Sequence, residues 1–126
     1  MTVLDASAVL ALVNDEPGAD TVAGALDGAM LGAANFAEVV GKLVDADADV
    51  VRLRRLLVSA GVAIEPVTAD DAELAGALRS IDGGRALSLG DRCCLALALR
   101  SPSTTVLTAD KAWGVLALPL RVVVVR

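Results

Sequence analysis

The chain has 126 residues, which suits one domain with a buried core and is too short for two. Hydrophobic residues make up 56% of it, yet no apolar run approaches the roughly 18–20 residues that a membrane-spanning helix needs. With 11 basic and 16 acidic residues the net charge is −5, which argues against a basic surface for binding nucleic acid.

The N-terminus and the cysteines indicate where the protein works. Residues 1–5 show neither the basic segment nor the cleavage pattern of a secretory signal. Cys93 and Cys94 are adjacent in a helical stretch, where neighbouring side chains point about 100° apart, so a disulfide between them is disfavoured. We therefore expect a reduced, cytoplasmic protein with no membrane partner. The apolar excess also predicts a surface reserved for another chain.

Short β-branched runs alternate with helical stretches along the chain. In chain order the predicted elements are a strand at 3–4, helices at 7–14 and 19–26, a strand at 30–31, helices at 36–44 and 50–60, a strand at 62–67, helices at 68–81 and 89–99, a strand at 104–107, a short helix at 110–116 and a strand at 122–125. Strands separated by helices imply right-handed crossovers and parallel pairing. The sequence therefore predicts one α/β domain over 1–126, a three-layer α/β/α sandwich with a mostly parallel sheet of four to five strands.

Four acidic residues from separate parts of the chain fall where such a sheet would gather them. Asp5 directly follows the first strand, and Asp110 follows the fourth. Ligands of open parallel sheets collect at the carboxyl ends of the strands. Glu38 and Asp91 occupy the first turns of predicted helices, whose N-termini face the same crevice. We therefore expect the four carboxylates to converge.

Converging carboxylates favour a bound cation. Two of them about 5 Å apart repel by roughly 3 kcal/mol at an effective dielectric near 20, so either their pKa values rise or a divalent ion is held. The chain has no histidine, and oxygen ligands from Asp5, Asp91 and Asp110 suit Mg²⁺ or Mn²⁺. Such an ion lowers the pKa of bound water and orients it for attack on a phosphodiester.

The negative net charge does not exclude a nucleic-acid substrate. With the four candidate acids set aside, 12 of the 16 acidic residues remain against 11 basic ones, so the rest of the surface is near neutral. Three cations close in sequence to a candidate acid are candidates for contacting phosphates: Arg85, Arg92 and Lys111. Because three such contacts are few, we expect weak, salt-sensitive binding.

Helix capping offers a structural explanation for each acid. Asp5 is placed to cap the helix that follows it, and Asp110 to begin a short helix. Asn35-x-x-Glu38 matches a capping box, and on an ideal wheel Glu38 lies opposite the apolar stripe of its helix, with Lys42 one turn on as an exposed salt-bridge partner.

Asp91 differs from the other three acids. Ser88-x-x-Asp91 also matches a capping box, but Asp91 shares its face with Leu95 and Ala98, so its carboxylate is expected to point inward, where it needs a partner or a metal. The residue patterns alone leave three alternatives open. These are a metal-dependent nuclease, a non-catalytic α/β interaction module whose acids are helix caps, and another Mg²⁺-dependent phosphoesterase.

The acid-bearing segments resemble those of the PIN-domain ribonucleases, specifically the VapC-type toxins. The segments are residues 3–7 (Val-Leu-Asp-Ala-Ser), 37–39 (Ala-Glu-Val), 88–91 (Ser-Leu-Gly-Asp) and 108–113 (Thr-Ala-Asp-Lys-Ala-Trp). They occur in the family's order, and the resemblance covers essentially the whole chain. It assigns a catalytic acidic tetrad to Asp5, Glu38, Asp91 and Asp110, with Ser7 and Thr108 as accessory hydroxyls near the metal.

The resemblance implies a function and partners. It implies a Mg²⁺- or Mn²⁺-dependent endoribonuclease that cleaves structured RNA, often tRNA or rRNA, as the toxin of a type II toxin–antitoxin system that inhibits translation. It also implies a homodimer neutralised by a VapB-like antitoxin, whose basic, partly helical tail covers the site. No acid beyond Asp110 stands close enough in the sequence to strengthen a second metal site, so the number of ions, one or two, stays open.

Overall fold

The computed structural model describes residues 1–101 and 104–126, and this part of the chain forms one five-stranded sheet in the order β3-β2-β1-β4-β5. The strands are β1 (Thr2–Leu4), β2 (Met30–Gly32), β3 (Ala63–Glu65), β4 (Thr105–Thr108) and β5 (Arg121–Val124). All four pairings are parallel. The predicted α/β fold with a parallel sheet is therefore confirmed.

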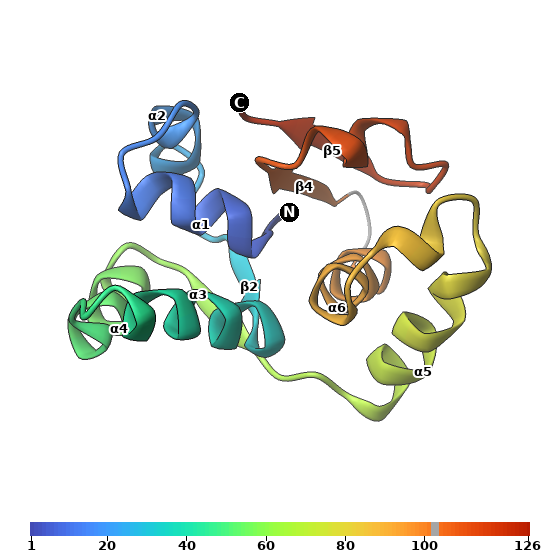
Figure 1. Ribbon diagram of the computed structural model, residues 1–126, viewed down its shortest axis with the longest axis horizontal. Helices are drawn as coiled ribbons and strands as arrows, with labels where there is room; N and C mark the ends of the chain where they lie inside the picture. The colour runs from blue at the N-terminus through green and yellow to red at the C-terminus, as the bar shows by residue number, and fades with distance from the viewer. Residues whose placement is uncertain (102–103) are drawn as a thin grey trace.

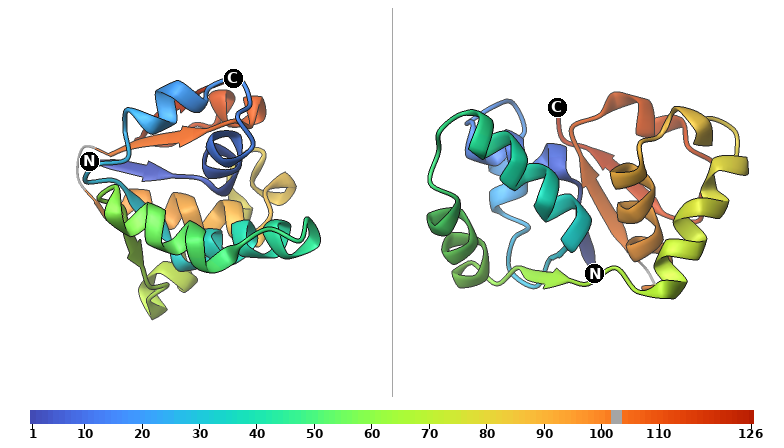
Figure 2. Two further views of the ribbon diagram at one scale, coloured as in Figure 1. Left: turned by 90° about the vertical axis from the view of Figure 1, so that its left-hand side faces the viewer. Right: turned by 60° about the horizontal axis from the view of Figure 1, so that its bottom comes forward.

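Helices cover both faces of the sheet. The described helices are α1 (Ala6–Val13), α2 (Ala19–Ala23), α3 (Ala33–Asp45), α4 (Val50–Ser59), α5 (Ala69–Ala77) and α6 (Leu89–Leu99), with 3₁₀ turns η1 (Leu78–Ser80), η2 (Gly84–Ala86) and η3 (Lys111–Val115). Figure 1 shows α1 to α4 on one side of the strands and α5 and α6 on the other. The views in Figure 2 show the same three layers from two further directions. None of the described helices has the length and apolar content needed to cross a bilayer.

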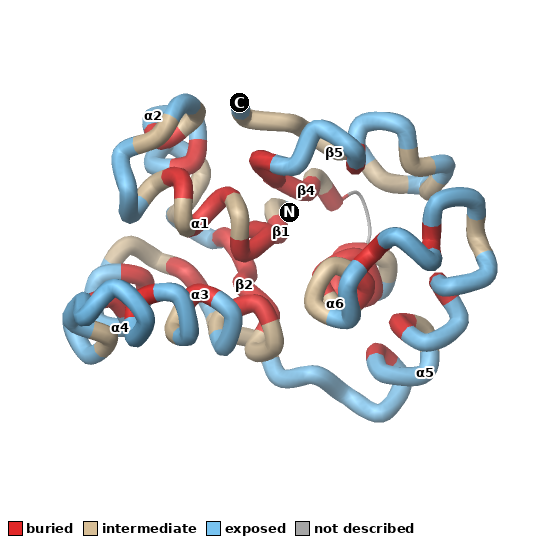
Figure 3. Tube along the Cα trace, in the orientation of Figure 1, coloured by how far each residue is buried: buried red, intermediate tan, exposed pale blue. Residues whose placement is uncertain are grey.

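Successive side chains along each strand point to opposite faces of the sheet, so the core has two parts, one on each face. Leu4 and Leu31, which are partners in the β1–β2 register, pack in a cluster with α1 to α4. Their chain neighbours Val3 and Met30 point to the opposite face and pack with α6 and the turns around it. The central strands therefore read as continuous apolar runs, as expected when both faces of a parallel sheet are covered. Figure 3 shows the buried residues concentrated on these strands and on α6.

Helix α6 is the most deeply buried helix beside the sheet. Its residues from Cys94 to Ala98 are all buried, and the helix contacts α3, α5 and strands β1, β2 and β4. Cys94 is enclosed, Cys93 is partly exposed, and both are free thiols. The expectation that they do not pair is confirmed.

Several element boundaries differ from the prediction. The helix predicted at 19–26 ends at Ala23, because Gly24 follows, with its low helix propensity. The helix predicted at 68–81 stops at Ala77 and tightens into η1. The strand predicted at 62–67 is shorter, consistent with its place at the edge of the sheet, where it pairs on one side only. The short helix predicted at 110–116 is the 3₁₀ turn η3.

Candidate active site

Asp5 lies buried at the carboxyl end of the central strand. Its backbone N–H donates to the carbonyl of Leu107 on β4 at 2.9 Å, which extends the β1–β4 ladder by one residue. Only 4% of the residue is exposed. Its Oδ2 accepts hydrogen bonds from Ser7 Oγ at 2.6 Å and from Thr108 Oγ1 at 3.0 Å. The ends of two adjacent parallel strands therefore meet at one carboxylate.

The two hydroxyls are themselves held by backbone groups. Ser7 Oγ accepts from the N–H of Ala109 at 2.9 Å, and Thr108 Oγ1 accepts from the N–H of Asp110 at 3.0 Å. A hydroxyl has a single hydrogen to donate, and both of these donate it to Asp5. The accessory hydroxyls that the family resemblance implies thus lie together, and they fix the orientation of the Asp5 carboxylate.

Helix capping does not explain the Asp5 side chain. Asp5 occupies the N-cap position of α1, but among the described residues its carboxylate makes no capping hydrogen bond to the helix. The carboxylate is instead engaged through Oδ2 by Ser7 and Thr108, and the backbone N–H of Ala6 adds a further stabilising interaction.

Glu38 reaches the same end of the sheet from α3. Its Oε1 accepts from Asn35 Nδ2 at 3.2 Å, and the same amide nitrogen donates to the carbonyl of Gly90 at the start of α6 at 3.0 Å. The predicted Asn35–Glu38 capping box is wrong, because α3 begins earlier, with Gly32 as its N-cap. Asn35 is therefore a fully buried residue within the helix, and it links the first turns of α3 and α6.

Asp91 is the third residue of α6, and its predicted capping box is confirmed. Its Oδ2 accepts from the backbone N–H of Ser88 at 2.9 Å, while the Ser88 hydroxyl accepts from the N–H of Asp91 at 3.0 Å. One carboxylate oxygen thus stabilises the helix start. The residue is half-buried, and its other oxygen has no donor among the described residues.

The three carboxylates act on one another electrostatically. Burial raises the pKa of Asp5, with a further rise from the charge of Asp91, while the hydrogen bonds from Ser7 and Thr108 oppose the rise. Glu38 is exposed overall, but desolvation of its carboxyl beside α6 raises its pKa, and the charges of Asp5 and Asp91 raise it further. The charges of Asp5 and Asp91 therefore act on Glu38, and that of Asp91 acts on Asp5, so these three residues form an acidic cluster; Asp110, the fourth acid expected to converge, is not among the charges that act on them.

Asp110 stands at the rim of this cluster. It is exposed directly after β4, and its Oδ1 accepts from the N–H of Ala112 at 2.9 Å, so it caps η3 as the structural explanation predicted. It lines a pocket together with Asp91 and with Asp82, from the loop before η2. Asp82 is not among the residues that the sequence predicts for the site, because no predicted helix start or strand end marks its position.

The acids are suited to a hard cation, although they are not assembled around a single point. In the described part of the chain, no three acidic or cysteine side chains are close enough to hold one ion in common. Asp91 and Asp110 each devote one oxygen to a helix start. Asp91 retains an oxygen with no donor among the described residues, and the repulsion between Asp91, Asp5 and Glu38 is of the kind that a divalent cation relieves. The residues present therefore fit Mg²⁺ or Mn²⁺ in ligand chemistry.

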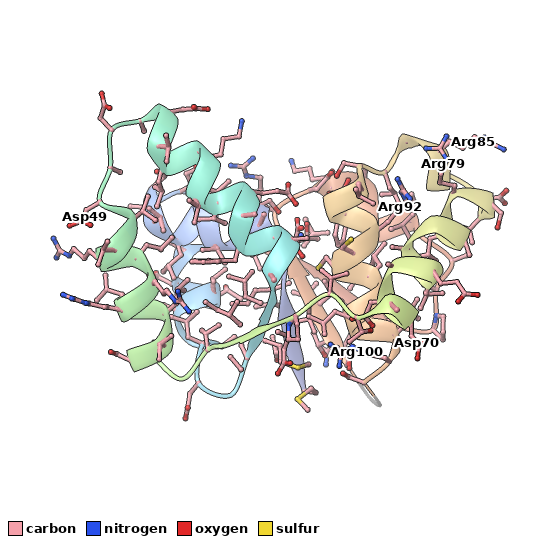
Figure 4. All side chains as sticks on the ribbon, turned by 90° about the horizontal axis from the view of Figure 1, so that it is seen from below. Asp49, Asp70, Arg79, Arg85, Arg92 and Arg100 are labelled. Atoms are coloured by element: carbon pink, nitrogen blue, oxygen red, sulfur yellow. The ribbon has the colours of Figure 1, made fainter. Side chains whose placement is uncertain are left out.

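The three predicted phosphate contacts occupy different environments. Lys111 is exposed and lines a hollow with Ser7, Asp110 and Arg126. Arg85 is exposed on η2 and, in Figure 4, lies beside Arg79 at the edge of the molecule.

Arg92 does not fit a role in contacting phosphate. It is buried between α6 and α5, where its Nη1 donates to the carbonyl of Ala75 at 2.8 Å (Figure 4). Adjacent helix positions point about 100° apart, so Arg92 turns toward α5 while Asp91 remains at the helix start. We therefore remove Arg92 from the candidate contacts.

Comparisons with known proteins agree on the fold. A toxin–antitoxin complex from Klebsiella pneumoniae has a TM-score of 0.76 at 22% identity over 98% of this chain and 96% of that chain. VapBC2 from Rickettsia felis, bound to a DNA fragment from its promoter, has a TM-score of 0.68 at 14% identity over 97% and 98%. FitAcB from Neisseria gonorrhoeae has a TM-score of 0.66 at 22% identity over 87% and 88%. No curated protein sequence matches significantly.

The family model for the PIN domain matches residues 2–117, from β1 to the turn after η3. The matched stretch contains the Asp5 cluster and both hydroxyls that hold it. The chain therefore belongs to the PIN-domain family.

Proposed function

We propose that this protein is a Mg²⁺- or Mn²⁺-dependent endoribonuclease of VapC type, the toxin of a type II toxin–antitoxin pair, which cleaves structured RNA such as tRNA or rRNA and so inhibits translation. PIN domains are in general divalent-metal-dependent nucleases. The observation that carries the proposal is the buried Asp5 carboxylate, held by Ser7 and Thr108 within the field of Asp91. A structural cap would not need this arrangement.

Each residue has a proposed role in the reaction. Asp5, Asp91 and Asp110 would hold the ion, with Glu38 completing the acidic tetrad. When bound, the ion supplies a water of lowered pKa and stabilises charge on the phosphate. Ser7 and Thr108 keep the Asp5 carboxylate oriented.

The proposed RNA contacts use two exposed cations, Lys111 beside Asp110 and Arg85 on η2. Lys111 and Arg85 would contact phosphates of the bound RNA. Contacts of this kind supply affinity without sequence selection, and they weaken as salt rises.

The proposed partners are an antitoxin, which would cover the site with a basic tail, and a second copy of the chain. Toxin–antitoxin complexes are among the proteins with the same fold. Large apolar side chains are exposed on the helices of one layer, among them Val13, Val44, Val51, Leu56 and Val58. Exposed apolar surface of this kind is typical of protein interfaces.

The experiment that tests the proposal is cleavage of a purified tRNA pool with Mn²⁺ and with EDTA. Asp5→Asn and Asp91→Asn are each expected to abolish cleavage. Asp70→Asn is the control, because Asp70 lies in the first turn of a helix, as Asp91 does, but at α5, where it is exposed and outside the proposed site. Cleavage retained by either site variant, or lost equally in the control, would contradict the assignment.

A non-catalytic interaction module is the second candidate. Asp91 and Asp110 both cap helices, and the described acids do not form a three-ligand group, which favours this alternative. It predicts no thermal stabilisation by Mn²⁺ and no RNA cleavage at any divalent concentration. Hydrolysis of a small phosphoester without RNA cleavage would instead support a different phosphoesterase.

A further inference from the structure

Asn35 is buried in a way that helix formation does not require. It is fully enclosed in the first turn of α3, and its amide nitrogen donates to both Glu38 Oε1 and the Gly90 carbonyl. Its Oδ1 is buried without a partner among the described residues. A buried oxygen without a hydrogen-bond partner destabilises the folded state. We therefore look to the two hydrogen bonds that the amide nitrogen donates for the reason that asparagine occupies this position.

Gly90 provides the space that the Glu38 carboxylate occupies. A Cβ built at Gly90 would lie 1.8 Å from Glu38 Oε1 and 2.6 Å from Glu38 Cδ. The backbone of Gly90 does not itself need glycine, since its φ is not in the left-handed region. Glycine is also a poor helix former at this second position of α6. Any larger residue at position 90 would therefore displace the carboxylate.

Glu38 has an obvious alternative partner that it does not use. Lys42 lies one turn further along α3 and is exposed, which is the spacing of a helical ion pair. Among the described residues, Glu38 forms no ion pair with Lys42 and bonds to Asn35 instead. The carboxylate is thus held toward α6 and away from the solvent-exposed face of α3.

We propose that Asn35 and Gly90 are positioning residues for Glu38, Asn35 by hydrogen bonding and Gly90 by leaving room. Together they hold the Glu38 carboxylate on the side of α3 that faces α6, within the field of Asp5 and Asp91, beside the place proposed for a divalent cation. The inference rests on the proposed function, because it assigns Glu38 a part in holding the ion. It extends that function to two residues outside the acidic tetrad. Neither residue contacts the reacting phosphate, and both act through Glu38.

The first test compares Gly90→Ala with Gly76→Ala by metal binding, without any activity assay. Both variants place a methyl group in a helix, but a Cβ at Gly76 meets no atom within 4 Å. The readout is the Mn²⁺ concentration that gives half of the maximal thermal stabilisation. We expect this midpoint to rise about tenfold or more for Gly90→Ala, the range typical when a group that orients a metal ligand is lost. It should stay unchanged for Gly76→Ala.

The second test establishes that the effect passes through Glu38. In a Glu38→Ala background there is no carboxylate to displace, so Gly90→Ala is expected to leave the Mn²⁺ midpoint unchanged. Asn35→Ala should follow the same pattern, while lowering thermal stability in both backgrounds because its bond to the Gly90 carbonyl is also lost. If Asn35→Ala does not fold, the comparison of Gly90→Ala in the native and Glu38→Ala backgrounds is sufficient to test the inference.

Two results would overturn the inference while leaving the proposed function intact. One is a Mn²⁺ response in the native protein that Gly90→Ala does not change. The other is an equal effect of Gly90→Ala with and without the Glu38 side chain, which would place its action on α6 itself. A native protein with no Mn²⁺ response at all would overturn both the inference and the proposed function.

Discussion

Replacing Thr108 by valine removes one hydroxyl from the centre of the site and changes little else. Thr108 is fully buried, and valine has nearly the same shape, so no cavity forms. The change deletes the 3.0 Å hydrogen bond to Asp5 Oδ2 and the 3.0 Å bond accepted from the N–H of Asp110. Ser7 remains as a donor to Asp5.

The expected cost of Thr108→Val follows from these two bonds. A hydrogen bond to a charged group contributes about 1.5–3 kcal/mol. The N–H of Asp110 belongs to an exposed residue and can bond to water, so its loss adds little. We expect the free energy of unfolding to fall by about 2 kcal/mol at pH 7. For a domain of this length that corresponds to a Tm lower by about 8 °C.

The cost should depend on pH. The Thr108 bond lowers the pKa of Asp5 by favouring its ionised form, although burial holds that pKa above 3.8 overall. Removing the bond raises the folded-state pKa further and leaves the unfolded value unchanged. The full cost is therefore present above the folded-state pKa, and it diminishes as the pH falls through that value and Asp5 becomes protonated.

Thermal unfolding followed by the fluorescence of Trp113 measures this effect. Trp113 is the only tryptophan in the chain and is 1% exposed in the core. Thr105→Val is the control, because it makes the same change on the same strand, where the hydroxyl forms no hydrogen bond with any described residue. A loss of stability for Thr108→Val no larger than for Thr105→Val, or one that stays constant from pH 7 to pH 3, would show that the Thr108 hydroxyl does not stabilise the ionised Asp5 carboxylate.

Three further substitutions test other parts of the structure. Asp5→Asn is expected to raise the Tm of the metal-free protein at pH 7. Burial raises the folded-state pKa of Asp5, so ionisation of the carboxyl lowers stability as the pH rises above about 3.8. The gain in Tm should therefore vanish in acid, and an equal gain at all pH values would contradict this cause. Trp113→Ala should lower the free energy of unfolding in urea by about 3–5 kcal/mol, whereas a loss below about 1 kcal/mol would mean that the second core cluster is loosely packed. Gly84→Ala should lower the free energy of unfolding by about 1–3 kcal/mol in the same urea assay, because its Cβ would lie 2.0 Å from the Leu78 carbonyl oxygen. An unchanged urea midpoint would show that η2 shifts without cost to make room for the methyl group.

The order of the elements and the meeting of Asp5 and Thr108 at the strand ends could be predicted from the sequence. Strands that alternate with helices usually pair in parallel through right-handed crossovers. Parallel pairing of β1 with β4 brings Asp5 and Thr108 to the same edge of the sheet. The family resemblance then placed Ser7 and Thr108 beside Asp5, where the structure also places them. These features depend on local pattern and topology, both of which a single sequence carries.

Features set by tertiary packing could not be read in this way. Asn35 matched a helix cap in spacing, but α3 starts three residues earlier, directly after β2, so Asn35 is the buried third residue of the helix and not its cap. Arg92 follows Asp91 in the chain, yet its side chain lies against α5. The importance of Gly90 depends on a side chain 52 positions away, so no local signal marks it.

We propose above that Asp5, Asp91 and Asp110 hold a divalent cation at the carboxyl end of the central strand, with Glu38 beside them. Anomalous diffraction from crystals soaked in Mn²⁺ tests it most directly. We expect a manganese peak in contact with carboxylate oxygens of Asp5 and Asp91 in native crystals, and no such peak in Asp5→Asn crystals. A peak bound elsewhere, or an empty crevice at saturating Mn²⁺, would contradict it.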